Sequence, residues 1–147
     1  MTDLEKAIIF ATKKHAGQLD KADKPYILHP LAVMMKLGTE QEQIVAVLHD
    51  VMEDCGVTAE ELSNEGFSRC IIEAVEAISR RKDKGETYRE YIQRCEKNTL
   101  AVMVKFADLE HNMSPERAKA LPEDERRGLE KRYMKALYYL KFGGWPK

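Results

Sequence analysis

Residues 46–54, AVLHDVMED, join an apolar run to an adjacent His49-Asp50 pair and then to a second acidic pair, Glu53-Asp54. On a helix, side chains three and four positions apart share a face, so Asp50 aligns with both later acids. His49 and Asp50 are about 100° apart on a helix with roughly 3.6 residues per turn, so both can reach one ion. Carboxylates are unfavourable at the negative end of the helix dipole, where a bound cation would stabilise them. The segment indicates a site for metal-assisted hydrolysis, and the alternative is a buried helix with a solvated acidic end.

The size and charge of the chain exclude several other classes of protein. At 147 residues, the sequence predicts a single domain over residues 1–147 that is large enough to bury a core. The formal net charge is −1, which provides no general attraction for nucleic acid. No apolar run approaches the ~20 residues of a membrane span, and the N-terminus lacks the pattern of a signal peptide. Cys55, Cys70 and Cys95 form no metal-binding or disulfide pattern, so we expect a cytoplasmic protein.

Apolar residues recur at helical spacing along nearly the whole chain. Threonines in front of three of these patterns mark helix starts, and the expected N-caps are Thr2, Thr58 and Thr87. We expect one continuous central helix over residues 40–54. Residues 100–108 contain β-branched side chains that also suit a strand, but Val104, Asp108 and Asn112 are at helical spacing and favour a buried helix. The sequence therefore predicts an all-α bundle of about seven or eight helices, with its polar sets meeting in the middle.

Four candidate metal ligands occur in the order His29, His49-Asp50 and Asp108. Pro30 directly after His29 suits the first turn of a helix, so the backbone there is restrained. Two imidazoles and two carboxylates suit Mn²⁺ or Fe²⁺ better than a closed structural zinc site rich in thiolates. Four protein ligands on an octahedral ion also leave positions for water and a substrate oxygen.

The order His…His-Asp…Asp resembles the HD superfamily of metal-dependent phosphohydrolases. Longer motifs narrow the resemblance, namely KHAGQ, PYILHPL, LHDVMED and VKFADLEHNM, which begin at residues 14, 25, 48 and 104. Together they resemble the hydrolase domain of the RelA/SpoT homologues over residues 7–136. Because no synthetase or regulatory segment follows, we expect a protein similar to the stand-alone small alarmone hydrolases, called Mesh in animals.

The resemblance implies a role for each matched residue. The implied Mn²⁺ ligands are His29, His49, Asp50 and Asp108, with Fe²⁺ or another divalent ion as the alternative. Glu53 and Asp54 match the acidic pair that positions and activates the attacking water, and the sequence does not separate their roles. The implied reaction removes the 3′-pyrophosphate of ppGpp or pppGpp and leaves GDP or GTP.

The implied partner is a small nucleotide, with no nucleic acid and no membrane, and association with a second copy is left open. Contacts to this nucleotide are expected from basic and polar side chains of three segments, one of them the basic loop (residues 80–85). The candidates are Lys21, Arg80, Lys82, Lys105 and Asn112.

Some positions depart from the family pattern. Asp20 stands where relatives carry a basic residue, and it would repel a pyrophosphate. His111 replaces a common tyrosine, and it could contact the nucleotide, hold a metal ligand or end a helix in solvent. The basic loop also differs from the frequent Thr-x-x-x-Lys arrangement. Another phosphorylated substrate, such as a nucleoside monophosphate or NADPH, therefore stays open. A degenerate nucleotide-binding regulatory module would have lost a ligand or an acid, and none is lost here.

Overall fold

Ten α-helices and one 3₁₀ turn make up the fold, and the only β-pairing is an isolated bridge between Leu19 and Pro25. The computed structural model describes all residues from 1 to 147. The all-α prediction is confirmed, and no helix combines the length and apolarity needed to cross a bilayer. In chain order the elements are α1 (Asp3–Lys14), α2 (Leu28–Met35), α3 (Glu40–Leu48), α4 (Val51–Cys55), α5 (Ala59–Asn64), α6 (Arg69–Ile78), η1 (Lys82–Lys84), α7 (Tyr88–Glu96), α8 (Thr99–Asn112), α9 (Pro115–Lys119) and α10 (Glu123–Phe142).

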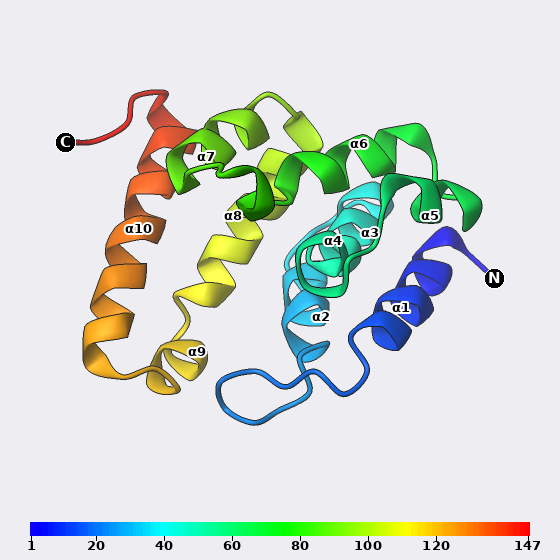
Figure 1. Ribbon diagram of the computed structural model, residues 1–147, viewed down its shortest axis with the longest axis horizontal. Coiled ribbons are helices and arrows are strands. Elements are labelled where there is room, and N and C mark those ends of the chain that lie inside the picture. Colours follow the sequence, from blue (N-terminus) through cyan, green and yellow to red (C-terminus); the bar gives the residue numbers. More distant parts are fainter.

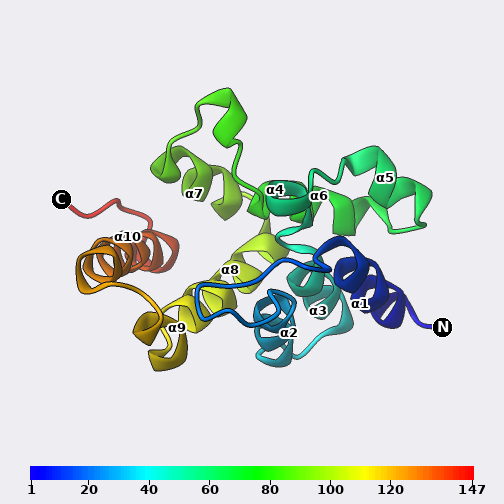
Figure 2. The same cartoon turned by 60° about the horizontal axis from the view of Figure 1, so that its bottom comes forward.

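Helix α8 runs through the middle of the molecule and packs against helices from both parts of the chain (Figure 1). It contacts α2, α3 and α6 in one direction and α7 and α10 in the other, and the two chain ends lie at opposite ends of the molecule (Figure 2). Helices α2, α3 and α8 also contact one another. Side chains that are distant in sequence can therefore share one site where these three helices meet.

Two apolar clusters bury the two flanks of α8. The main core joins α1 to α6 with α8, and it includes the fully buried Leu48, Val75 and Val104. A smaller cluster joins α7, α8 and α10 through Ile92, Leu109 and Ala136, together with Tyr91. Burying a Val or Leu side chain stabilises a fold by about 1.5–3 kcal/mol. Packing on both flanks therefore explains the apolar run of α8 and holds the helix firmly in place.

The expected N-caps are confirmed. Thr2, Thr58 and Thr87 each accept a hydrogen bond at 3.1 Å from the backbone N–H three residues later. Such a cap stabilises a helix by about 1 kcal/mol. Pro30 lies in the first turn of α2, as expected, which places His29 inside this helix.

The prediction of one continuous helix over residues 40–54 is wrong, because the chain breaks at His49 and Asp50. Helix α3 ends at Leu48 and α4 begins at Val51. The His49 ring is the physical reason: its Nδ1 lies 2.6 Å from the carbonyl oxygen of Ala46, which the N–H of Asp50 would otherwise take. The break makes α4 a separate helix, and α9 is a second helix that the sequence did not predict. These two helices raise the observed number to ten, above the seven or eight expected.

Candidate active site

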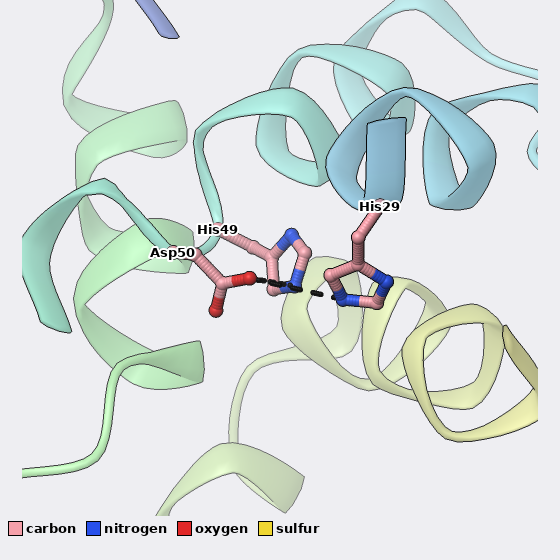
Figure 3. A group of neighbouring side chains, drawn as sticks. All are labelled: His29, His49 and Asp50. Carbon is pink, nitrogen blue, oxygen red and sulfur yellow. Dashed lines mark ion pairs between the residues drawn. The ribbon is translucent and has the colours of Figure 1, made fainter. Parts of the chain in front are cut away.

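Four polar side chains meet where α2, α3 and α8 come together. His29 comes from the first turn of α2, His49 and Asp50 from the break after α3, and Asp108 from α8. His29, His49 and Asp108 are only 3%, 2% and 4% exposed. Figure 3 shows the rings of His29 and His49 and the carboxylate of Asp50 turned toward a common point. The helix break is therefore what turns His49 and Asp50 toward one centre.

The atoms of this cluster are spaced like the ligands of one ion. Nε2 of His29 lies 2.9 Å from Oδ1 of Asp108 and 3.7 Å from Oδ2 of Asp50. Nε2 of His49 lies 3.0 Å from the same Asp50 oxygen and 3.3 Å from the same Asp108 oxygen. Neighbouring ligands at about 2.1 Å from an octahedral ion are about 3 Å apart. The four predicted ligands are thus brought together at distances that fit a divalent metal ion.

The proton positions also favour a cation at this centre. Nδ1 of His49 must carry its proton to donate to the Ala46 carbonyl, which leaves Nε2 as the atom that faces the carboxylates. This buried Nε2 has no hydrogen-bond partner. Burial lowers the pKa of His49, but the nearby Asp50 and Asp108 outweigh it and hold the pKa well above the ordinary value. The two carboxylates therefore draw positive charge to a point where an ion fits.

The two carboxylates are themselves held by hydrogen bonds. The Tyr26 hydroxyl donates to Oδ2 of Asp50 at 2.7 Å, and Nζ of Lys105 donates to Oδ2 of Asp108 at 2.8 Å. Burial raises the pKa of both carboxyl groups, but the charge of His49 beside Asp50, and of Lys105 and His49 beside Asp108, lowers both pKa values on balance. Both groups are ionised at neutral pH, as metal ligands must be.

The second acidic pair is divided between two environments. Oε1 of Glu53 accepts a 2.6 Å hydrogen bond from the backbone N–H of Arg80, and Oδ2 of Asp54 accepts a 3.3 Å bond from the Gln18 amide. Partial burial raises the pKa of both carboxyl groups, and the charge of Asp50 adds to this effect. Glu53 lines the cavity beside the metal ligands, whereas Asp54 is not among its lining residues. The structure therefore brings Glu53 closer to the cluster's open side than Asp54.

The cluster opens into a polar cavity of about 200 Å³. Several cationic side chains face this cavity, and they are Arg80, Lys82, Lys105 and Arg117. A second cavity of about 300 Å³ lies beside it and carries more apolar side chains, among them Leu28, Leu121 and Leu129. The two cavities share His29, Asn112, Arg117 and Tyr133. One elongated ligand could therefore place a charged end near the metal ligands and a less polar end in the second cavity.

A family model described as HD domain matches residues 7–135, which is most of the chain. The chain belongs to the HD domain family. Members of this family bind a divalent metal ion, and the cluster of His29, His49 and Asp50 can hold one.

Several curated proteins resemble this HD domain. The guanosine-3′,5′-bis(diphosphate) 3′-pyrophosphohydrolase of Aquifex aeolicus is 33% identical over 72% of the chain, and that of Haemophilus influenzae is 32% identical over 84%. A GTP pyrophosphokinase of Myxococcus xanthus is 31% identical over 75% of the chain. The alignments cover only 16%, 20% and 16% of these three relatives' lengths.

A solved structure described as a metazoan orthologue of SpoT that hydrolyses ppGpp has the same fold as this HD domain. The two align with a TM-score of 0.84 at 22% identity, over 97% of this chain and 87% of the other. At this identity the likeness establishes the fold.

The predicted substrate contacts of the HD domain fall into distinct groups. Arg80 and Lys82 line the metal-side cavity as expected, and Lys105 reaches it while bound to Asp108. Lys21 instead lines the second cavity, where it pairs with Glu125 of α10 and is 61% exposed. Asn112 lines both cavities.

Asp20, which the sequence predicts would repel a pyrophosphate, lines the second cavity and not the metal-side cavity. Oδ1 of Asp20 accepts hydrogen bonds from the backbone N–H groups of Ala22 and Lys24, at 2.8 Å and 3.0 Å. The carboxylate thereby shapes its own loop, and Lys21 and Lys24 line the same cavity beside it.

Sequence reasoning missed three residues of the site. Tyr26 belongs to the PYILHPL motif. A buried tyrosine hydroxyl needs a polar partner, and here that partner is Asp50. Arg117 of α9 and Tyr133 of α10 belong to none of the sequence motifs described above. Arg117 reaches the site because α9 folds back beside α8, where Nε donates to Oδ1 of Asn112 at 3.1 Å.

The position of His111 resolves an alternative that the sequence left open. Its Nδ1 lies 2.7 Å from Nδ1 of His29, and the two rings are nearly parallel, at 20° to one another, with centroids 5.0 Å apart. Burial and the neighbouring His29 lower the pKa of His111 to about 4. His111 is therefore neutral at physiological pH and contacts a predicted metal ligand, although it also lines the second cavity.

Proposed function

We propose that this HD domain is a Mn²⁺-dependent hydrolase that removes the 3′-pyrophosphate of ppGpp or pppGpp and leaves GDP or GTP. One observation carries the proposal: the metal-ligand cluster, an acidic side chain and several cations line a single cavity. Relatives at 32–33% identity that are named for this reaction support the choice of substrate.

The proposed ligands are His29, His49, Asp50 and Asp108. A divalent ion held there neutralises phosphate charge and lowers the pKa of a bound water toward neutrality. Nitrogen and oxygen ligands without thiolate suit Mn²⁺, with Fe²⁺ as the alternative.

Glu53 is the proposed general base. It lines the cavity, and the N–H of Arg80 holds Oε1 in a fixed direction. Partial burial raises its pKa, which strengthens the carboxylate as a proton acceptor. Asp54 is held by Gln18 and does not line the cavity, and it would orient the α4 segment that carries Glu53.

Three cations are placed to bind the substrate phosphates. Arg80 and Lys82 approach from the basic loop, and Arg117 approaches from α9. Nε of Arg117 is engaged by Asn112, whereas its terminal Nη atoms have no hydrogen-bond partner in the protein and are available to an anion. The two amide ends of Asn112 contact Asp108 and Arg117, so Asn112 would orient both of them.

The second cavity is the proposed nucleoside site. It adjoins the metal cluster through His29 and carries apolar side chains suited to a base. Lys21 and Arg117 at its walls could contact the 5′-phosphates.

The test measures pyrophosphate release from ppGpp with added Mn²⁺, beside an EDTA-treated sample and a panel of nucleoside monophosphates and NADPH. We expect Mn²⁺-dependent release from ppGpp alone. Release of phosphate from another panel member would support the metal-dependent hydrolysis but refute ppGpp as the substrate. No turnover of any compound by the metal-loaded protein would refute the enzymatic proposal and favour a nucleotide-binding module.

Variants of the acidic pair test the assignment of the base. Glu53→Gln should abolish turnover by removing the proton acceptor, while Mn²⁺ affinity stays near that of the unchanged protein. Asp54→Asn should reduce turnover less. Full activity of Glu53→Gln would rule out Glu53 as the base.

A further inference from the structure

His111 contacts one of the four proposed ligands, His29, from outside their cluster. It lies in the last turn of α8, three residues after Asp108, and its Nδ1 is 2.7 Å from Nδ1 of His29. The rings are nearly parallel, at 20° to one another. A separation this short between two ring nitrogens requires one proton between them.

The direction of this hydrogen bond follows from what His29 must do. Nε2 of His29 faces Asp50 and Asp108, so this is the nitrogen that binds a metal ion. A neutral imidazole that binds metal through Nε2 carries its only proton on Nδ1. His29 therefore donates from Nδ1, and Nδ1 of His111 accepts.

The two metal-binding rings are oriented by different means. His49 donates its Nδ1 proton to the backbone carbonyl of Ala46, a partner that no substitution removes. His29 donates to a side chain, so its orientation depends on the identity of residue 111. Partners of this kind fix the tautomer and the direction of a ligand, and their loss typically weakens metal binding by about 10–100-fold.

We infer that His111 is a positioning residue that accepts the Nδ1 proton of His29 and thereby directs Nε2 of His29 at the metal ion. The inference rests on the proposed metal site, but it does not depend on the identity of the nucleotide. Of the three roles considered from the sequence, the inference selects the second: His111 holds a metal ligand, His29.

Two variants separate the hydrogen bond from the packing of the ring. His111→Asn places an amide oxygen where Nδ1 stood, so it can still accept from His29. His111→Phe keeps an aromatic ring but removes the acceptor. Circular dichroism and thermal unfolding in the absence of metal check that both variants fold.

The experiment measures the affinity for Mn²⁺ alone by competition with a fluorescent chelator, without nucleotide. We expect His111→Phe to bind Mn²⁺ about 10–100-fold more weakly and His111→Asn to recover most of this loss. The visible spectrum of the Co²⁺-loaded protein should change in His111→Phe and be restored in His111→Asn, a response that a purely structural role would not produce.

Several results would overturn the inference. Unchanged Mn²⁺ affinity in His111→Phe would show that His29 needs no acceptor, and the proposed function would stand. Equal losses in both variants would show that the ring itself, and not its acceptor atom, matters. An unchanged protein that bound neither Mn²⁺ nor Co²⁺ would refute the metal site and the proposed function together.

Discussion

The buried ion pair between Lys105 and Asp108 makes the most direct energetic prediction, because Lys105→Met removes one charge and leaves the other buried. The side chains are 7% and 5% exposed, and Nζ and Oδ2 are 2.8 Å apart. Removing one partner of a buried pair costs about 3–5 kcal/mol. Asp108 retains the hydrogen bond from Asn112, so we expect the lower end, about 3 kcal/mol.

Thermal unfolding of the metal-free protein measures this cost. For a chain of this size, 1 kcal/mol lowers Tm by about 2–4 °C, so the expected decrease is about 6–12 °C. Saturating Mn²⁺ should reduce the difference, because the ion replaces the missing positive charge beside Asp108. Metal affinity should rise in the variant, since a competing cation has been removed.

A matched variant controls for the substitution itself. Lys36→Met breaks an ion pair to Glu110 on the same helix as Asp108, with N–O distance 3.2 Å and side chains 32% and 71% exposed. Exposed pairs contribute about 0–1 kcal/mol, so its Tm should change little. If Lys105→Met and Lys36→Met gave equal Tm values without metal, the argument that Lys105 compensates Asp108 would be refuted.

Three further predictions concern the acids, the basic loop and the metal. Gln18→Leu removes the hydrogen bond that lowers the pKa of Asp54, so this pKa should rise. Because a base works when it is deprotonated, the acid limb of the pH–kcat profile should move to higher pH if Asp54 is the base. The acid limb should stay unchanged if Glu53 is the base. Arg94 of α7 donates hydrogen bonds to the carbonyl oxygens of Glu76 and Ser79 and to Glu86, and Ser79 and Glu86 flank the basic loop. Arg94→Met should therefore lower stability by about 2 kcal/mol and raise KM, whereas Arg69→Met on an exposed pair should do neither. EDTA should abolish turnover yet leave the helical circular dichroism spectrum intact, because the apolar core does not depend on the ion; loss of helix would contradict this.

The fold class could be predicted because it depends on local spacing, and the candidate ligands could be predicted because their residue types and order match a family pattern. Helical periodicity and capping threonines identify helices without any knowledge of their packing. The order of His29, His49, Asp50 and Asp108 carried the resemblance to HD phosphohydrolases, and the structure brings these four side chains together.

The helix break at His49 and the role of α9 could not be predicted in this way. The break depends on a side chain that competes with the backbone for the carbonyl of Ala46, and intrinsic propensity does not report such competition. Arg117 and Tyr133 reach the site through packing of α9 and α10 against α8, which is a property of the tertiary structure alone.

The geometry of α8 explains how one helix serves both stability and chemistry. Val104 packs into the main core and Leu109 into the smaller cluster, so the rotation of the helix is fixed by apolar contacts on two flanks. Lys105, Asp108 and Asn112 lie at spacings of three and four residues and therefore share the strip between these flanks. Asp108 is consequently aimed at His29 and His49 by core packing, before any ion is bound. Because tight cores resist displacement, this arrangement favours a site whose ligands are oriented in advance, so that binding energy is not spent on ordering them.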